Sequence, residues 1–547
     1  MGIEPHRKSN SLAHGLTSIG VKKGDRVAVS LGNNIEYAVA TYALFKLGAL
    51  LVPLNPAFNA AQVSSALNHL GASYLIIDVE TNLPHKPPRS NLPLLKHLIP
   101  SIHRHTLTSE LIPSLRHLVL LDNSSGRIPT HNLYATTAFH NLQHSSPHRS
   151  HHSPVPLSHL HPTETINIQF TSGTTSTPKA ACLTHRNILN NGFQIGDRLL
   201  LTPKSIVCCP PPLFHCFGSI LGYMATATHG SCIVFPSEAF NPLAALHAIQ
   251  KEKCTALYGV PTMFVSELDL LENGTVKQTG FEQLRTGIAA GSSIPAALMQ
   301  KLHSRLNLTD LTICYGMTET SPVSAMTTTD DPLRMRLESV GRPLPHVEVK
   351  VVDPGHKEKI LPVGEKGEVA VSGYLIMKEY WNDEEQTTDV LIPDKAGKVW
   401  MHTGDEGTLT PHGHLKITNR LKDLIIRGGE NIHPLEIENR ILSYPLVSDV
   451  SVVGIPDERY GEVVGAFVIC NPKCEGGNGG GWKRGEKEEE DVRKWVRAGL
   501  SHHLVPRYVF FVNEFPKTAS GKVQKFKMRE IGVEMLRERE KERDDCD

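Results

Sequence analysis

Short apolar runs alternate with longer segments of helical periodicity along the first part of the chain. The apolar runs are rich in Val, Leu and Ile, which favours buried strands, and they cover 26–31, 49–54 and 73–77. The segments that alternate with them carry apolar residues at helical spacing and cover 11–20, 34–47 and 60–70. Strands that alternate with helices predict a wound, largely parallel α/β sheet.

The same alternation returns further along, where the apolar runs lead towards glycine or proline. These runs cover 165–170, 205–209, 231–235, 256–258, 284–291 and 311–316, with a helix predicted over 241–252. Ligands of wound sheets bind beyond the carboxyl ends of the strands. We therefore expect several of these strand exits to line one crevice.

The pattern changes near Val347 to short strands separated by turns, which predicts a β-rich subdomain. A third region begins near Asp423, with helices predicted over 434–443 and 491–502 and strands over 447–453 and 463–470. The predicted fold class is α/β. A large N-terminal domain of wound sheets with the β-rich subdomain would cover 1–421, and a small mobile α+β domain would cover 422–547.

Two segments depart from this regularity. Residues 84–161 are rich in His, Pro and Ser and are predicted to form a mobile insertion, with a strand over 118–121 inside it. Histidines recur at every fourth position from His140 to His152, but Pro147 argues against the helix that a metal site would need. Residues 475–490 contain six glycines and a charged run, so a flexible insertion is predicted there, and the charged end from Arg537 is expected to fray.

Composition narrows the possible functions. The 547 residues include 56 basic and 56 acidic side chains, so neither a general nucleic-acid surface nor a general membrane surface is indicated. The ten cysteines are scattered, which fits a reducing compartment better than a disulfide framework. We see no transmembrane run, secretory signal or peroxisomal SKL tail, and we expect an intracellular protein, cytoplasmic by default.

The segment 171–179, TSGTTSTPK, is the strongest candidate for chemistry. It follows the predicted strand 165–170 and leads towards a predicted helix, and it carries six hydroxyl side chains, Gly173 and Lys179. Hydroxyls, backbone N–H groups and a lysine at such a turn suit a polyphosphate. A Ser/Thr-rich surface linker is the alternative. A Walker A loop is excluded, because Ala180 follows Lys179.

Four later segments carry further polar groups, each with a plainer alternative. In YGMTET, at 315–320, an aromatic ring could flank a purine and a carboxylate could hold Mg²⁺, or Thr318 could simply cap a helix. In HTGD, Asp405 after a predicted strand could bind ribose hydroxyls, or form an ordinary turn. The segment 419–432, NRLKDLIIRGGENI, could be a basic linker. Lys522, in KTASGK, could be a solvated surface lysine.

These five segments, in this order, resemble those of the adenylate-forming (ANL) superfamily. The stretches 285–329 and 401–527 are most similar to medium-chain fatty acyl-CoA synthetases, and the resemblance covers roughly 12–534 apart from the two insertions. It implies an ATP-dependent acyl-CoA synthetase that converts a carboxylic acid to its CoA thioester through an acyl-adenylate. Its partners would be a small carboxylic acid, ATP and CoA, with Mg²⁺ as the metal, and the oligomeric state stays open.

The resemblance also assigns roles by position. The loop 171–179 would bind the β- and γ-phosphates, Thr318 the α-phosphate, Glu319 the Mg²⁺ and Asp405 the ribose, while Lys522 would bridge the substrate carboxylate and the α-phosphate. The residues that contact ATP or AMP would be Thr171, Ser172, Gly173, Thr174, Thr175, Ser176, Thr177, Pro178, Lys179, Gly291, Ser292, Tyr315, Gly316, Asp405 and Arg420. The acyl group would be bordered by His215, Tyr258, Gly259, Val260 and Ile288. The CoA tunnel would be bordered by Gly428, Gly429, Glu430 and Asn431, with Lys422 as the hinge of the mobile domain.

Three departures from the family accompany this interpretation. Ser176 and Ala180 stand where glycines are common, and the family's early strand and helix before 11–20 are expected to be missing. Two alternative functions remain at this point. One is a CoA ligase for an aromatic or specialised-metabolite acid, such as a polyketide-pathway acid. The other is a non-catalytic homologue that binds nucleotide or acyl-adenylate, against which Glu319, Asp405 and Lys522 argue.

Overall fold

The computed structural model describes residues 3–83, 86–144, 152, 154, 159–171, 179–291, 294–428, 430–471, 486–518 and 523–544. The chain forms two compact units. Unit 1 comprises residues 1–349 and 371–401, and unit 2 comprises residues 350–370 and 402–547. None of the helices in the described ranges is both long and apolar enough to span a membrane.

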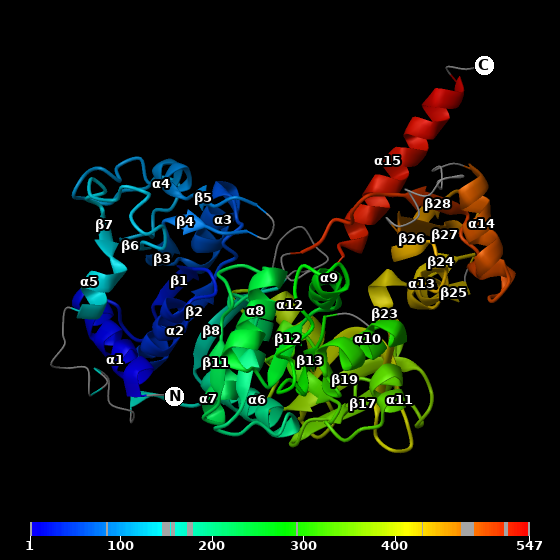
Figure 1. Ribbon diagram of the computed structural model, residues 1–547, viewed down its shortest axis with the longest axis horizontal. Coiled ribbons are helices and arrows are strands. Elements are labelled where there is room, and N and C mark those ends of the chain that lie inside the picture. The colour runs from blue at the N-terminus through cyan, green and yellow to red at the C-terminus, as the bar shows by residue number, and fades with distance from the viewer. Residues whose placement is uncertain are drawn as a thin grey trace. The chain divides into compact units, whose positions relative to one another are not determined.

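The first sheet of unit 1 has the strand order β20-β9-β8-β2-β1-β3-β6-β7. Figure 1 labels its strands from β8 to β7. Its strands are β1 (Arg26–Ser30), β2 (Leu50–Pro53), β3 (Tyr74–Asp78), β6 (His117–Leu121), β7 (Thr136–Ala138), β8 (Thr165–Phe170), β9 (Ala180–Thr184) and β20 (Glu379–Tyr380). From β8 to β7 neighbouring strands are parallel, whereas β9 is antiparallel to both β8 and β20. The wound parallel sheet that the sequence predicts is therefore present.

Local sequence explains where the helices of this sheet begin and end. Helix α2 (Ile35–Leu47) starts at Asn34, whose side chain accepts a hydrogen bond from the Tyr37 N–H, and stops at Gly48 in the left-handed conformation. Helix α3 (Ala60–Leu70) starts with a capping box formed by Asn59 and Gln62. Helix α1 (Ile3–Ser18), which begins earlier than the sequence predicts, packs against α2 and α5 (Phe139–His144).

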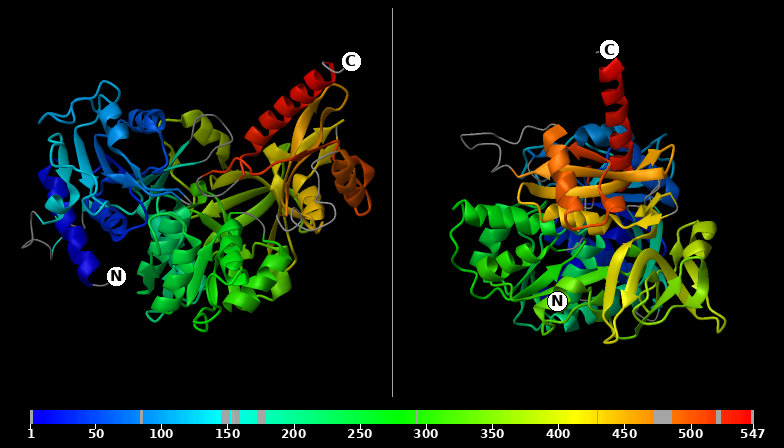
Figure 2. Two further views of the ribbon diagram at one scale, coloured as in Figure 1. Left: turned by 45° about the horizontal axis from the view of Figure 1, so that its top comes forward. Right: turned by 90° about the vertical axis from the view of Figure 1, so that its right-hand side faces the viewer.

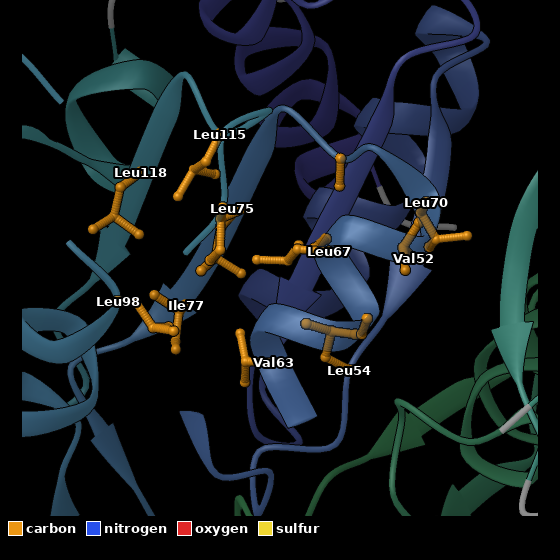
Figure 3. Close-up of a cluster of buried hydrophobic side chains, with 14 of the residues drawn as sticks. Val52, Leu54, Val63, Leu67, Leu70, Leu75, Ile77, Leu98, Leu115 and Leu118 are labelled. Carbon is orange, nitrogen blue, oxygen red and sulfur yellow. The ribbon is translucent and has the colours of Figure 1, made fainter. Parts of the chain in front are cut away.

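One apolar core of unit 1 joins α3 to the strands beneath it, as Figure 3 shows. The labelled side chains come from α3, from β2 and the residue that follows it, from β3 and β6, and from the segment between β3 and β6. This corrects the expectation of a mobile insertion over 84–161, because α4 (Leu92–Leu98), β6, β7 and α5 lie within it. Leu95, Leu98 and Leu115 are almost fully buried in the core, and the strand over 118–121 is confirmed.

The second sheet of unit 1 has the order β11-β10-β12-β13-β14-β15-β16. Its strands are β10 (Ile206–Cys208), β11 (Cys232–Val234), β12 (Ala256–Gly259), β13 (Thr286–Ala289), β14 (Asp310–Gly316), β15 (Val323–Met326) and β16 (Arg342–Pro343). From β11 to β14 the strands are parallel, and β15 and β16 are antiparallel additions. Helix α9 packs between α8 and α10 (Figure 1). These helices are α8 (Pro242–Glu252), α9 (Pro261–Glu272) and α10 (Ala296–Leu306).

A third sheet contains the β-rich region that the sequence predicts. Its order is β18-β17-β19-β22-β21, with β23 paired to β22. The strands are β17 (Val347–Asp353), β18 (His356–Ile360), β19 (Gly367–Gly373), β21 (Leu391–Pro393), β22 (Val399–Leu409) and β23 (Leu415–Arg420). Strands β17, β19 and β22 each contribute residues to both units.

The C-terminal part of unit 2 is an α+β domain whose sheet has the order β25-β24-β27-β26, with β28 beside β27. Its elements are β24 (Ile425–Arg427), β25 (Glu430–Ile432), α13 (Pro434–Leu442), β26 (Val447–Asp457), β27 (Gly461–Cys470), α14 (Glu486–Arg497), β28 (Tyr508–Phe511) and α15 (Lys525–Asp544). Helix α15, red in Figure 2, packs against β26 and includes residues 537–544 of the charged stretch that was expected to fray. Residues 486–490 of the predicted second insertion belong to α14, and 475–485 lie outside the described residues.

Candidate active site

Four of the predicted site residues of unit 1 follow the carboxyl ends of parallel strands. His215 follows β10, Val260 follows β12, Gly291 follows β13 and Glu319 follows β14. Parallel strands end on the same edge of a sheet, so these exits share one edge, and the expectation that they line one crevice stays a prediction. Gly291 has φ +97° and a Cβ there would lie 3.3 Å from Val260 Cγ1, which ties two of the exits together.

The loop 171–179 joins two antiparallel strands rather than a strand and a helix, which corrects the sequence prediction. Phe170 is paired with Ala180, and the Thr171 N–H donates to the Lys179 carbonyl over 2.8 Å. The apolar run 180–184 is fully buried as β9, and α6 (His185–Arg198) begins only after it. Thr171 and Lys179 thus form the base of the loop. Ser172, Gly173, Thr174, Thr175, Ser176, Thr177 and Pro178 lie outside the described residues.

Polar contacts connect the end of β8 to the strand exits of the second sheet. The Gln169 amide donates to the Phe214 carbonyl over 2.6 Å. Next to Phe214, Cys216 Sγ lies 3.6 Å from Thr318 Oγ1. The His215 Nδ1 accepts from the Phe217 N–H at 3.2 Å. The base of the candidate phosphate loop, His215 and Thr318 are therefore held in one region of unit 1.

Thr318 and Glu319 lie in a short 3-10 turn, η4 (Thr318–Thr320), that follows Met317. Thr318 is the first residue of this turn and not its cap, so the helix-cap alternative is wrong. The Met377 N–H donates to the Glu319 carbonyl over 2.8 Å and fixes the turn from another segment. A Cβ on Gly316 would lie 1.7 Å from the Pro322 carbonyl oxygen, so only glycine fits before the turn.

The Glu319 carboxylate is almost buried, at 6% exposure, and receives a hydrogen bond from Tyr380. The Tyr380 hydroxyl donates to Glu319 Oε1 over 2.7 Å. The Lys179 Nζ lies 4.9 Å from the centre of the Tyr380 ring. Sequence reasoning did not find Tyr380, which precedes Trp381 in an otherwise polar stretch, KEYWNDEE.

A magnesium ion bound with nucleotide phosphates needs few protein ligands, since it keeps waters and phosphate oxygens. Glu319 fits this requirement, because its second oxygen is not used by Tyr380 and Thr318 adjoins it. Within the described part of the chain no group of three or more His, Cys, Asp or Glu side chains could hold a metal by itself. Glu319 and Thr318 could therefore take part in holding a metal that arrives with ATP.

Three of the five predicted acyl-binding residues, Tyr258, Val260 and Ile288, lie in one apolar cluster of unit 1. Tyr258 and Ile288 are fully buried and Val260 nearly so, and the Tyr258 and Phe217 rings stack at 6.3 Å. A Cβ on Gly259 would come within 3.0 Å of the Phe264 ring. Phe217 begins a buried π-helix, η3 (Phe217–Met224), and such helices are frequent at functional sites. Among the described residues the buried Tyr258 hydroxyl has no hydrogen-bond partner.

Asp405 lies inside strand β22 of unit 2, whereas the sequence places it after a strand. It is cross-strand neighbour to Arg420 on β23, and Arg420 Nε is 3.1 Å from Asp405 Oδ1. Gly404 has φ +69°, which explains why the sequence pattern resembles a turn although the strand continues. The structure thus brings together Asp405 and Arg420, as the candidate ribose site requires.

A second buried carboxylate holds the backbone beside Asp405. Glu368 Oε2 lies 3.0 Å from His402 Nδ1, and Glu368 Oε1 accepts from the Gly404 N–H at 3.1 Å. The side chains of Glu368 and His402 are 5% and 3% exposed. Burial opposes ionisation of Glu368, but the hydrogen bond and charge of His402 outweigh it and lower the pKa of this carboxyl.

The predicted hinge and CoA-binding residues follow β23. Lys422 is exposed in a 3-10 turn, η5 (Leu421–Asp423), between β23 and β24. Gly428 has φ +59° and its N–H donates to the Tyr460 carbonyl over 2.7 Å at the turn of the β24–β25 hairpin. Glu430 and Asn431 are exposed in β25.

Three more of the predicted residues cannot be placed. Ser292, Gly429 and Lys522 lie outside the described residues. On either side of Lys522, Lys517 and Val523 form an antiparallel bridge, and the Gln524 N–H donates to the Pro516 carbonyl over 2.8 Å. The roles assigned to these residues stay predictions.

Comparison with known proteins identifies similarity over nearly the whole chain. The AMP-binding enzyme family model matches residues 4–381, and the AMP-binding enzyme C-terminal domain matches residues 436–522. The acyl-CoA ligase sidI of Aspergillus fumigatus is 40% identical over 97% of this chain and 86% of its own length. The medium-chain acyl-CoA ligase ACSF2, mitochondrial, of Danio rerio is 36% identical over 95% of this chain and 81% of its own.

Solved structures share the fold at lower identity. The crystal structure of ATP-bound MatB from Rhodopseudomonas palustris superposes with a TM-score of 0.80 at 24% identity. The match covers 96% of this chain and 92% of that protein. The mixed α/β fold, with a large N-terminal and a small C-terminal domain, is confirmed.

Proposed function

Because the chain belongs to the family of AMP-binding enzymes, we propose a substrate, a metal and residue roles for it as an AMP-forming acid–CoA ligase. The enzyme class itself is that of the acyl-CoA ligases, which use ATP and CoA. The proposed substrate is a medium-chain fatty acid or a similar apolar acid. The observation that carries the residue roles is the buried Glu319 carboxylate beside Thr318, at a strand end and in one network with Lys179.

The chemistry requires two steps. A substrate carboxylate oxygen attacks the α-phosphorus of ATP, the bond to the β-phosphate oxygen breaks, and acyl-adenylate and pyrophosphate form. The CoA thiolate then attacks the acyl carbon, and AMP leaves with the oxygen that linked it to the acyl group. Both partners of the first step are anionic, so cationic groups must offset their repulsion.

We assign the groups that offset this repulsion to residues, as the resemblance implies. Lys179 and the 171–179 loop would bind the β- and γ-phosphates, Thr318 the α-phosphate, and Glu319 a Mg²⁺ ion. Bound there, Mg²⁺ supplies charge to the phosphate oxygens as a Lewis acid. Lys522 would contact the substrate carboxylate and the α-phosphate during adenylation. Asp405, supported by its contact with Arg420, would accept hydrogen bonds from the ribose.

Tyr258, Val260 and Ile288 favour an apolar acyl group, since they belong to one apolar cluster. Burial of each additional methylene of the acid contributes about 0.8 kcal/mol. A medium-chain acid would therefore bind better than acetate by virtue of its chain alone. Lys422 would act as the hinge that lets Gly428, Glu430 and Asn431 reach CoA for the second step.

A second candidate is an acid that carries a polar group, as specialised-metabolite acids do. The buried Tyr258 hydroxyl, which has no partner within the described ranges, favours it. A buried hydroxyl without a partner costs about 1–3 kcal/mol, which a substrate hydroxyl or carbonyl could offset. Aromatic acids are a further class of substrate to be tested.

ATP–pyrophosphate exchange over a panel of aliphatic, hydroxylated and aromatic acids tests the proposal. We expect exchange with medium-chain acids, loss of exchange in Lys522→Ala, and a CoA thioester when CoA is added. A preference for hydroxylated acids that Tyr258→Phe removes would favour the second candidate. Exchange with none of the acids would contradict the proposed function, and exchange without thioester would indicate another acceptor.

A further inference from the structure

The segment that carries Tyr380 is fastened to two parts of the candidate site. Tyr380 and Glu379 form β20, which pairs with β9 directly after the 171–179 loop. The Trp381 N–H donates to the Ala180 carbonyl over 2.8 Å. At the other end of the segment, the Met377 N–H donates to the Glu319 carbonyl over 2.8 Å. Tyr380 is thus held at a fixed place between the base of the loop and the η4 turn.

The Tyr380 side chain contacts one functional group on each side. Its hydroxyl donates to Glu319 Oε1 at 2.7 Å, and the Lys179 Nζ lies 4.9 Å from its ring centre. The residue is 3% exposed, so water competes little with either contact. Its backbone N–H also donates to Thr387 Oγ1 at 2.9 Å, which limits movement of the whole residue.

A phenol suits this position better than a second charged group would. The hydroxyl fixes one carboxylate oxygen of Glu319 and leaves its negative charge uncompensated. The ring attracts the Lys179 ammonium without neutralising it. In the described part of the chain no ion pair joins Lys179 to Glu319, and the Lys179 ammonium lies over the Tyr380 ring. Burial and the neighbouring Glu319 raise the pKa of Tyr380, so it stays a donor at neutral pH.

We propose that Tyr380 is a positioning residue that orients the Glu319 carboxylate for the metal and holds Lys179 ready for the ATP phosphates. The inference rests on the proposed role of Glu319 as the magnesium ligand. It makes Tyr380 the shared support of the metal side and the phosphate side of the site. Removal of a side chain that hydrogen-bonds to a metal ligand typically lowers metal affinity by roughly 10–100-fold.

The hydroxyl is tested by metal binding and not by turnover. Mn²⁺ is the probe, and its dissociation constant in the presence of ATP is measured by electron paramagnetic resonance for wild type, Tyr380→Phe, Glu319→Gln and the double variant. We expect Tyr380→Phe to weaken Mn²⁺ binding about 10-fold. Because Tyr380 acts through Glu319, Tyr380→Phe should cause almost no further loss of Mn²⁺ affinity in the Glu319→Gln background.

Tyr223→Phe is the matched control. The Tyr223 hydroxyl is also buried in unit 1 and donates to Thr41 Oγ1 at 3.2 Å, outside the candidate metal site. Tyr223→Phe removes one buried tyrosine hydrogen bond, as Tyr380→Phe does, and should leave Mn²⁺ binding unchanged. Thermal unfolding of both variants shows how much of any effect is loss of stability.

The ring is tested by nucleotide binding without metal. Tyr380→Phe keeps the ring and Tyr380→Leu removes it, so calorimetric titration with ATP in EDTA separates the two contacts. We expect near wild-type ATP affinity for Tyr380→Phe and a loss of about 2–5-fold for Tyr380→Leu, as a cation–π contact of about 0.5–1 kcal/mol implies.

The outcomes separate the inference from the proposal on which it depends. If Glu319→Gln leaves Mn²⁺ binding unchanged, both the metal role of Glu319 and the inference are contradicted. If Glu319→Gln weakens binding but Tyr380→Phe matches wild type and the Tyr223→Phe control, only the inference is overturned. Equal Mn²⁺ losses in Tyr380→Phe with and without Glu319 would likewise overturn it, because Tyr380 would then act independently of that carboxylate.

Discussion

The two units each contain a buried carboxylate beside candidate ATP contacts, but they hold it in different ways. In unit 1 the partner of Glu319 is the neutral phenol of Tyr380. In unit 2 the partners of Glu368 are the His402 imidazole and the Gly404 N–H. A carboxylate that is to bind a cation must keep its charge available, whereas one that only fixes backbone can be fully paired. The comparison favours the proposed role of Glu319 in chemistry and indicates an architectural role for Glu368.

Glu368→Ala tests the architectural side and should have the largest effect on stability. The change leaves His402 and the Gly404 N–H without their acceptor in a buried place. Removing one member of such a pair costs about 3–5 kcal/mol. Urea unfolding, followed by a probe in unit 2, measures this cost. A loss below about 1 kcal/mol would show that the pair does not hold the strand.

Glu319→Gln tests the chemical side and should show the opposite pattern. The amide oxygen can still accept from Tyr380, so thermal stability should change little. Adenylation should fall at least about 100-fold, since a bound metal contributes several kcal/mol to stabilising transition-state charge. The rate of pyrophosphate exchange at saturating acid measures this. Near wild-type exchange, or unfolding comparable to Glu368→Ala, would remove the distinction between the two carboxylates.

Acid should affect the architectural carboxylate in a predictable direction. The folded-state pKa of Glu368 is lowered, so the unfolded chain binds more protons in the window below its usual value of about 4.3. The pair therefore contributes its full stability above that value and loses it as the pH falls through the folded pKa. The difference in unfolding free energy between wild type and Glu368→Gln should shrink from pH 6 towards pH 3 (both approximate). A difference that grows on acidification would contradict the assignment.

Arg420→Ala should have the smallest effect on stability. The Arg420 side chain is 45% exposed, so its contact with Asp405 is screened by solvent. We expect a change in unfolding free energy below about 1 kcal/mol, together with a modest rise in the KM for ATP. Asp405→Asn, in comparison, should raise that KM more, because it removes the proposed ribose acceptor. Equal KM values for the two variants would argue against a ribose role for Asp405.

Regular elements with strong apolar patterns were predictable from sequence. Helix α3 and strand β8 have the predicted bounds, and the predicted helix over 241–252 is α8 (Pro242–Glu252). Elements were not predictable from sequence where local composition and tertiary packing disagree. Pro and His around Leu95 and Leu98 suggested a mobile insertion, yet these two leucines complete the core of the first sheet.

The candidate site shows the same limit. The small residues of 180–184 gave no clear strand signal, so the hairpin that closes the candidate phosphate loop was missed. Gly404 suggested a turn where β22 continues. Tyr380 could not be identified from the sequence, because its role depends on a contact with Glu319, 61 residues away along the chain. Motif residues with a family resemblance were predictable, whereas the side chains that support them required the fold.

The central claim is attack of a carboxylate on the α-phosphorus of ATP, and the products test it most directly. Wild-type protein is incubated with octanoate, ATP and CoA, and nucleotides and thioester are separated and quantified. The account predicts AMP, pyrophosphate and octanoyl-CoA in equal amounts, and no products with Lys522→Ala. Formation of ADP and phosphate with the thioester, or no formation of AMP and pyrophosphate with any acid of the panel, would contradict it.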